Sequence, residues 1–142
     1  MTTDKFRFFH PIQVRFADTD AQGHVFFGTY FTYFDEAMAA YMRAIGCPWQ
    51  SLADLGIDMY YVDANCQFKA PSYFEETLHV YARISRIGNS SVTFEFAIHK
   101  QADDQAVATG QLVSVVVDLE SSQSTIVPEK IRSAVSAYEN EA

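Results

Sequence analysis

The sequence predicts an α+β domain in which an antiparallel sheet of about five strands wraps around one long central helix. Three observations support this fold class. Apolar side chains recur at three- and four-residue spacing over residues 30–45, which is the spacing of one helical face. One segment before this helix and four segments after it have strand-like patterns. An antiparallel sheet has one apolar face to bury, and the long apolar helix is the element that can cover it.

The first strand is expected over residues 6–16, where aromatic and β-branched side chains mix with polar ones. Two starts of the central helix are compatible with the sequence, because Thr29 could be its N-cap or the helix could begin near Val25. It should end near Ile45, since Gly46 and a proline two residues later stop a helix. Four polar residues of the helix are expected to face water: Thr32, Asp35, Glu36 and Arg43.

Residues 49–55 suit one or two short helical turns that Gly56 ends. Strand patterns then fill most of the remaining chain, over residues 59–69, 77–87, 92–99 and 107–119. The second and third of these alternate apolar and polar side chains around a short turn, which predicts an antiparallel pair. The four consecutive strands could form a meander. A short last helix is expected from Pro128 to about Tyr138.

Composition limits the classes of function. With 142 residues and no linker or low-complexity run, we expect a single domain over residues 1–142. A net charge of −8 argues against a nucleic-acid partner. The absence of a long apolar run argues against a membrane partner, so we expect a cytoplasmic location. Aromatic residues make up 15% of the chain, which indicates self-association or an apolar ligand tunnel. The cysteines and histidines lack metal-ligand spacing, so no metal is expected.

The clearest candidate for chemistry is the segment Asp18-Thr19-Asp20, directly before the central helix. A helix N-terminus presents unpaired amides and the positive end of the helix dipole, which favour negative charge, including charge that develops in a reaction. A carboxylate and an anion site would then be neighbours. An aspartate at this position can equally be a cap or turn residue.

Residues 14–25, VRFADTDAQGHV, together with Tyr30, resemble the signature of hotdog-fold acyl-CoA thioesterases of the 4-hydroxybenzoyl-CoA thioesterase type. The resemblance extends to Phe68-Lys69-Ala70-Pro71 and to residues 113–128, so it covers most of the chain. It implies a hotdog-fold homodimer, often paired into a homotetramer, with active sites at the dimer interface. It also implies that the acyl group lies in a tunnel beside the central helix.

The resemblance further implies residue roles. Asp20 would be the catalytic carboxylate and the backbone amide of Phe27 the oxyanion donor, whereas Asp18 would be structural. The residues around them, Gly23, His24 and Tyr30, would belong to the substrate site. His24 could bond to Asp20 or to substrate, or could be a partly exposed turn residue. Four further residues are expected to bind the coenzyme A part of an acyl-CoA substrate: Lys69, Arg86, Ser90 and Ser91.

Thioester hydrolysis needs a carboxylate and donors for the oxyanion, and it requires no cofactor. Asp20 could attack the thioester directly or act as general base toward water. Asp35 and Glu36 are reserve candidates, because related hotdog enzymes use a carboxylate on the central helix. A non-catalytic module that binds acyl-CoA or another apolar ligand is the main alternative, and a hydratase is a weaker one. The acyl group stays open among short-chain, medium-chain and aromatic classes, as does a carrier-protein thioester.

Overall fold

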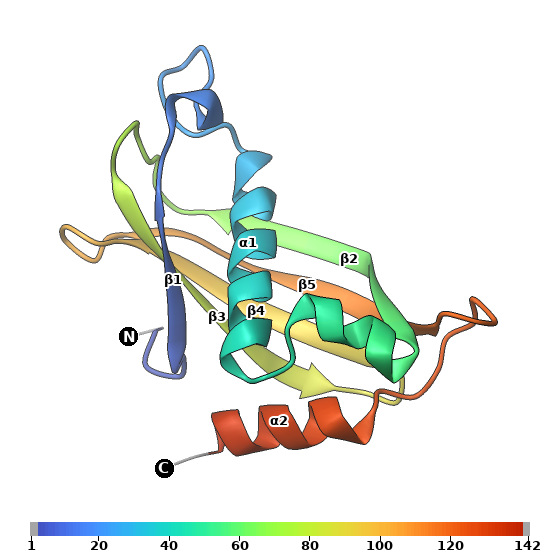
Figure 1. Ribbon diagram of the computed structural model, residues 1–142. Coiled ribbons are helices and arrows are strands. Elements are labelled where there is room, and N and C mark those ends of the chain that lie inside the picture. Colours follow the sequence, from blue (N-terminus) through green and yellow to red (C-terminus); the bar gives the residue numbers. More distant parts are fainter. Residues whose placement is uncertain (1–2, 141–142) are drawn as a thin grey trace.

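The computed structural model describes residues 3–140. It contains one antiparallel sheet, with the strand order β1-β3-β4-β5-β2, and a long helix that lies across one face of this sheet (Figure 1). The predicted α+β class, with about five strands around a central helix, is therefore confirmed, and it is the arrangement that the hotdog resemblance implies. The strands are β1 (Phe8–Gln13), β2 (Ile57–Phe68), β3 (Thr77–Ile87), β4 (Ser91–Lys100) and β5 (Ala106–Asp118); the helices are α1 (Thr29–Ala44) and α2 (Glu129–Glu139).

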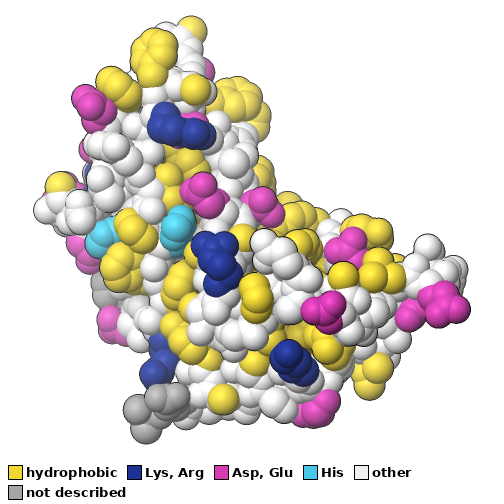
Figure 2. All heavy atoms as spheres, in the orientation of Figure 1, with side chains coloured by type: hydrophobic (Ala, Val, Ile, Leu, Met, Phe, Trp, Pro, Cys, Tyr) yellow, Lys and Arg dark blue, Asp and Glu magenta, His cyan; other side chains and the backbone are white. Residues whose placement is uncertain are grey.

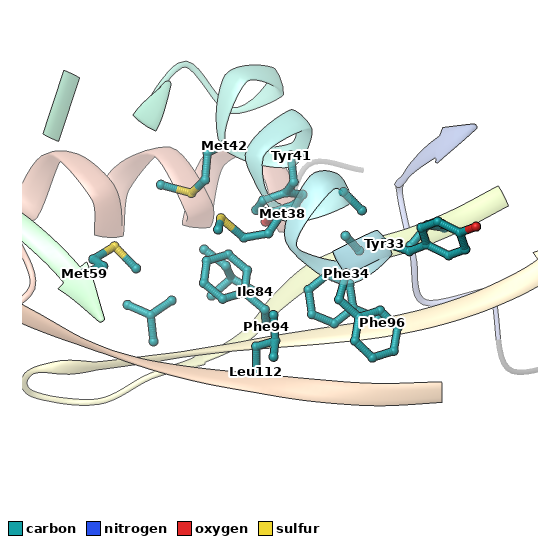
Figure 3. Close-up of a cluster of buried hydrophobic side chains, with 14 of the residues drawn as sticks. Tyr33, Phe34, Met38, Tyr41, Met42, Met59, Ile84, Phe94, Phe96 and Leu112 are labelled. Carbon is teal, nitrogen blue, oxygen red and sulfur yellow. The ribbon is translucent and has the colours of Figure 1, made fainter. Parts of the chain in front are cut away.

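Helix α1 is enclosed on the face that the sequence periodicity marks as apolar. Eight of its sixteen residues are buried, and among them Phe34 is fully buried against the sheet. The Phe34 ring stacks on that of Phe96 from β4, with centroids 4.5 Å apart (Figure 3). On β5, Gly110 leaves the room that this ring needs, because a Cβ there would lie 2.5 Å from a Phe34 ring carbon. The helix is thus held at a fixed depth against the sheet.

Both ends of α1 are defined by local chemistry. Gly46, with a φ of 86°, follows the helix, as the sequence predicts. At the other end Thr29 is the first helical residue and Gly28 is the N-cap, so the expectation that Thr29 could be the N-cap is wrong. A start near Val25 is also wrong, because Val25 forms a β-bridge with Thr19 and its backbone is extended there.

The first strand is shorter than residues 6–16. It ends at Gln13, and Phe16–Asp18 forms a 3-10 turn instead. The cause is Asp18, whose carboxylate accepts a hydrogen bond from the Arg15 amide over 3.0 Å and so closes the turn that strand pairing would open.

The meander expectation holds only in part. Strands β3, β4 and β5 are consecutive antiparallel neighbours, but β2 pairs with β5 at the far side of the sheet rather than with β3. The chain therefore crosses the sheet between Phe68 and Thr77. This crossing returns the segment 69–76 to the end of α1 where the Asp20 turn lies (Figure 1), and it places residues from two distant parts of the sequence together.

The shorter elements agree with the sequence. A 3-10 helix occupies Trp49–Leu55, and Gly56 ends it with a φ of 75°. Helix α2 packs beyond the C-terminal end of α1, where the Tyr41 hydroxyl donates to the Glu139 carboxylate over 2.5 Å. None of the helices within residues 3–140 is both long enough and apolar enough to span a bilayer.

Candidate active site

Asp20 begins a tight turn that the backbone closes by itself. The Gly23 amide donates to the Asp20 carbonyl over 2.9 Å, and the Asp20 amide donates to the His24 carbonyl over 3.0 Å. Gly23 has a φ of 85°, a left-handed conformation that glycine adopts readily. The Asp20 carboxylate accepts the Gln22 amide at Oδ1 over 2.9 Å, while Oδ2 has no hydrogen-bond partner among residues 3–140. One carboxylate oxygen is thus fixed and the other is available to a ligand.

Two backbone amides are unpaired where α1 begins. Thr29 and Tyr30 donate to the carbonyls of Phe26 and Phe27 over 2.9 and 3.4 Å. The amides of Phe27 and Gly28, in contrast, donate to no acceptor in the described part of the chain. Unpaired amides at the positive end of a helix dipole favour an anion. This pair is therefore suited to accept the oxyanion of a tetrahedral intermediate.

A cleft of about 380 Å³ lies beside this helix end. It has an aromatic wall, in which the Phe68 ring lies 6.2 Å from that of Phe27 and 5.9 Å from that of Tyr30, centroid to centroid. The Tyr30 hydroxyl is 2.7 Å from Ser72 Oγ, which fixes the ring on its buried side. The residues that line the cleft are Asp20, Gln22, His24, Val25, Phe27, Tyr30, Phe68, Lys69, Ala70 and Pro71.

The end of the molecule that holds this cleft is rich in exposed aromatic side chains. Figure 2 shows hydrophobic side chains gathered there, where α1 begins. Such a concentration of exposed apolar side chains is typical of a binding region. The exposed aromatic residues of this end are Phe16, Phe26, Phe27, Phe68, Tyr73 and Phe74.

The two aspartates of the segment differ sharply in environment. Asp18 is only 6% exposed, and its carboxylate accepts hydrogen bonds from the Tyr33 hydroxyl over 2.8 Å and from the Arg15 amide and guanidinium. Burial alone would raise the pKa of the Asp18 carboxyl, but these hydrogen bonds outweigh burial and lower that pKa below its ordinary value. Asp18 has no free oxygen for a substrate, which leaves Asp20 as the aspartate that can react.

Of the residues expected in the site, the cleft brings together five, and Gly23 shapes the turn that carries Asp20. The His24 ring does not bond to the Asp20 carboxylate: its Nδ1 lies 3.1 Å from the Val25 carbonyl oxygen, and the ring faces Tyr73 edge-on with centroids 6.5 Å apart. The five residues are Asp20, His24, Phe27, Tyr30 and Lys69.

The remaining coenzyme A residues lie elsewhere. Arg86, Ser90 and Ser91 surround the β3–β4 turn, at the opposite end of the sheet from the Asp20 cleft (Figure 1). Strand β3 separates that turn from the cleft, and at roughly 3.3 Å per residue its 11 residues span about 33 Å. Within one chain, these three residues and Asp20 cannot contact the same small group.

The reserve carboxylates on α1 are also outside the cleft. Asp35 accepts a hydrogen bond from the Tyr61 hydroxyl over 2.6 Å, and Glu36 lies 3.9 Å from His10 Nε2. Both side chains are exposed, as the helical pattern predicts. Within residues 3–140, no three His, Cys, Asp or Glu side chains gather as a group that could hold a metal ion.

Sequence reasoning missed two contributors to the site. Phe68 belongs to the Phe68-Lys69-Ala70-Pro71 segment, but no pattern in the sequence indicates that its ring faces Tyr30. Ser72 bonds to Tyr30 through its hydroxyl, and its carbonyl accepts the Val25 amide over 2.9 Å. Both contacts depend on the crossing between β2 and β3, which the sequence did not predict.

Comparison with known proteins places these features in a family context. The sequence model of the Thioesterase-like superfamily matches residues 14–135. A Pseudomonas aeruginosa protein of solved structure is 32% identical, over 94% of this chain and 92% of its own, with a TM-score of 0.83. The structure of a gentisyl-coenzyme A thioesterase is 30% identical, over 90% of this chain and 99% of its own, with a TM-score of 0.81. A 1,4-dihydroxy-2-naphthoyl-CoA hydrolase of Synechococcus elongatus is 26% identical over 121 residues, 84% of this chain and 88% of its own.

Proposed function

This chain belongs to the Thioesterase-like superfamily, and on that premise we propose that it hydrolyses acyl-CoA thioesters with Asp20 as the catalytic carboxylate. As a member of this superfamily it is a thioester hydrolase. The observation that carries the assignment to Asp20 is local. A carboxylate with one free oxygen lines the same cleft as Phe27, whose amide is unpaired at the start of a helix.

These groups divide the reaction between them. The free oxygen of Asp20 either takes a proton from water as water attacks the thioester carbon, or attacks that carbon itself to give an acyl anhydride that water then hydrolyses. In both routes the carbonyl oxygen becomes an oxyanion, which the Phe27 and Gly28 amides can stabilise. The tetrahedral intermediate then collapses, the C–S bond breaks and coenzyme A leaves as a thiolate. In the general-base route this step gives the carboxylic acid directly. In the nucleophilic route it gives the anhydride, and attack of water on the anhydride releases the carboxylic acid and restores the Asp20 carboxylate.

The cleft favours an aromatic acyl group. Phe27, Tyr30 and Phe68 supply three ring faces or edges, and a flat ring packs against such surfaces with less loss of conformational entropy than a flexible chain. The relatives named for gentisyl-CoA and 1,4-dihydroxy-2-naphthoyl-CoA act on aromatic acyl groups of this kind. We therefore place an aryl-CoA first among the substrates of this chain.

A second copy of the chain would complete the site. Strand β2 is an edge strand of twelve residues, and Tyr60, Tyr61 and Val62 on it are 56%, 43% and 61% exposed. An exposed edge of this length and apolar character is suited to pair with another strand. The homodimer that we propose joins β2 to the β2 of a second copy in antiparallel fashion, as a two-fold axis requires; two such dimers could form the homotetramer.

This pairing gives the coenzyme A residues a role. Ile57 and the β3–β4 turn lie at one end of the sheet, and Phe68 with the Asp20 cleft lies at the other. Antiparallel pairing of two copies of β2 brings these opposite ends together. The partner's Arg86 and Ser90 would then approach the cleft that contains Lys69, and the three could contact the phosphates of coenzyme A.

The test is thiol release from a panel of aliphatic and aromatic acyl-CoAs, with the parent protein compared with Asp20→Asn and Glu36→Gln. We expect turnover of at least one aryl-CoA, a loss on the order of 100-fold or more in Asp20→Asn, and parent-like turnover in Glu36→Gln. Circular dichroism checks that each variant is folded. An inactive Glu36→Gln beside an active Asp20→Asn would show that the wrong carboxylate was chosen. Tight acyl-CoA binding without turnover by the parent would favour the non-catalytic module.

A further inference from the structure

Asp18 bonds to two separate segments near the cleft, to one through its side chain and to the other through its backbone. Its carboxylate accepts a hydrogen bond from the Tyr33 hydroxyl of α1 over 2.8 Å, and its backbone carbonyl accepts the Phe26 amide over 2.9 Å. Tyr33 is only 2% exposed, so its bond to Asp18 is shielded from water. The Arg15 guanidinium also reaches Asp18, over 3.2 Å, but that side chain is 75% exposed and contributes less.

Phe26, whose amide is bonded to Asp18, determines the direction of the Phe27 N–H. Its own amide is fixed by Asp18, and its carbonyl accepts the Thr29 amide over 2.9 Å. The peptide bond from Phe26 to Phe27 is planar and trans, so the Phe27 N–H points opposite to the Phe26 carbonyl. Fixing that carbonyl therefore fixes the direction of the Phe27 N–H.

Side-chain packing does little to hold this segment. Phe26 and Phe27 are 44% and 61% exposed, so neither ring is locked in the core. The segment is tethered on one side by the Val25 amide, which donates to the Ser72 carbonyl, and on the other by Asp18. Loss of the Asp18 tether would leave Phe26 free to rotate while the core beneath it stayed intact.

We propose that Tyr33 and Asp18 are positioning residues for catalysis, which hold the Phe27 amide in the orientation that accepts the oxyanion. The inference rests on the proposed function, because it assigns Phe27 as the oxyanion donor. Neither Tyr33 nor Asp18 lines the cleft. Their effect is on the transition state, where the oxyanion exists, rather than on binding of the ground state.

The matched pair of variants is Tyr33→Phe and Tyr41→Phe. Each removes one hydroxyl that donates from α1 to a carboxylate, Asp18 in the first case and Glu139 in the second, and each keeps its ring in the core. Tyr41 lies at the other end of the helix from the cleft. General loss of stability should therefore be similar in the two variants, and only Tyr33→Phe should disturb the site.

Two readouts decide the inference. In Tyr33→Phe, hydrogen exchange at the Phe26 amide should accelerate about tenfold or more, while kcat should fall roughly tenfold or more and KM should change by no more than about twofold. In Tyr41→Phe, both Phe26 exchange and kcat should stay within about twofold of the parent values.

The outcomes separate the inference from the function. Unchanged Phe26 exchange in Tyr33→Phe would show that Asp18 does not hold the segment, and faster exchange with parent-like kcat would show that the tether has no catalytic effect. Equal losses of kcat in the two variants would also overturn the inference, because they would indicate a general loss of stability. If the parent hydrolyses no thioester, the proposed function is wrong, and so is the catalytic role of Tyr33 and Asp18. Hydrogen exchange at the Phe26 amide would still show whether Asp18 holds this segment.

Discussion

Gly110→Ala should destabilise the protein strongly, because Gly110 is where the sheet makes room for α1. A Cβ at this position would lie 2.4 Å from the backbone oxygen of Asn65 and 2.5 Å from a Phe34 ring carbon. Asn65 belongs to β2, which pairs with β5 along its length. Phe34 is fully buried and stacks on Phe96. Neither neighbour can move away without breaking the β2–β5 ladder or shifting α1.

The expected loss can be worked from these contacts. Overpacking of a filled core costs about 1–3 kcal/mol, and two rigid contacts at once place Gly110→Ala near the upper end, at about 3 kcal/mol. Replacing glycine by alanine also lowers the entropy of the unfolded chain, which offsets about 0.4–1 kcal/mol. The net decrease in the free energy of unfolding should therefore be about 2 kcal/mol or more.

Urea unfolding, followed by far-ultraviolet circular dichroism at one protein concentration, measures this decrease. The control is Gly56→Ala, since Gly56 has a φ of 75° but a Cβ there would meet nothing within 4 Å. That control should lose only about 1–2 kcal/mol, from its left-handed backbone. If Gly110→Ala were as stable as the parent, or more stable than the control, the sheet would not set the depth of α1 through this contact.

Three other predictions test separate features. The pKa of Asp18 is lowered in the folded protein, so its contribution to stability is present at neutral pH and is lost as pH falls through and below the ordinary Asp value of about 3.9. The difference in urea midpoint between the parent and Asp18→Asn should therefore shrink over that pH range. A difference that stayed constant would contradict this prediction. Burial raises the pKa of the Cys66 thiol from 9.0 to about 11, so iodoacetamide at pH 8 should alkylate it about a hundredfold more slowly than an ordinary thiol. Mass spectrometry of a time course measures this rate in the Cys47→Ser variant, in which Cys66 is the single thiol. Light scattering should give the parent a mass of at least twice the 16.0 kDa of one chain. Val62→Lys, on the edge of β2, should shift the measured mass toward that of one chain. A monomeric parent would exclude the proposed dimer.

Much of the fold could be predicted because its signals are local. The periodicity of α1 depends only on the spacing of apolar side chains, and the same holds for the alternation in β3 and β4. The end of β1 was harder, because the bond from the Arg15 amide to Asp18 decides it. The start of α1 was harder because Val25 forms a β-bridge with Thr19. A side chain that competes with strand pairing leaves no periodic signal.

The candidate site, like the fold, could be predicted from the sequence only in part. The resemblance to the thioesterase signature indicated Asp20 and Phe27, and the turn, the glycine and the helix start around them all lie within a few residues of one another. The aromatic wall was not predicted, because Phe68 and Ser72 reach Tyr30 only through the crossing from β2 to β3. The turn with Arg86 and Ser90 was assigned to the same site, although a full strand length separates it from Asp20 within one chain.

The sequence by itself determined the elements of this protein and the residues with reactive groups, because helical and strand periodicity and tight turns arise between neighbours along the chain. Tertiary structure decided which of two aspartates is buried and which is free, and which side of the sheet β2 joins. It also decided which aromatic rings face the cleft. These outcomes depend on contacts such as Tyr33 with Asp18, 15 residues apart, and Tyr30 with Ser72, 42 residues apart. Burial and hydrogen bonding over such separations exist only once the chain has folded.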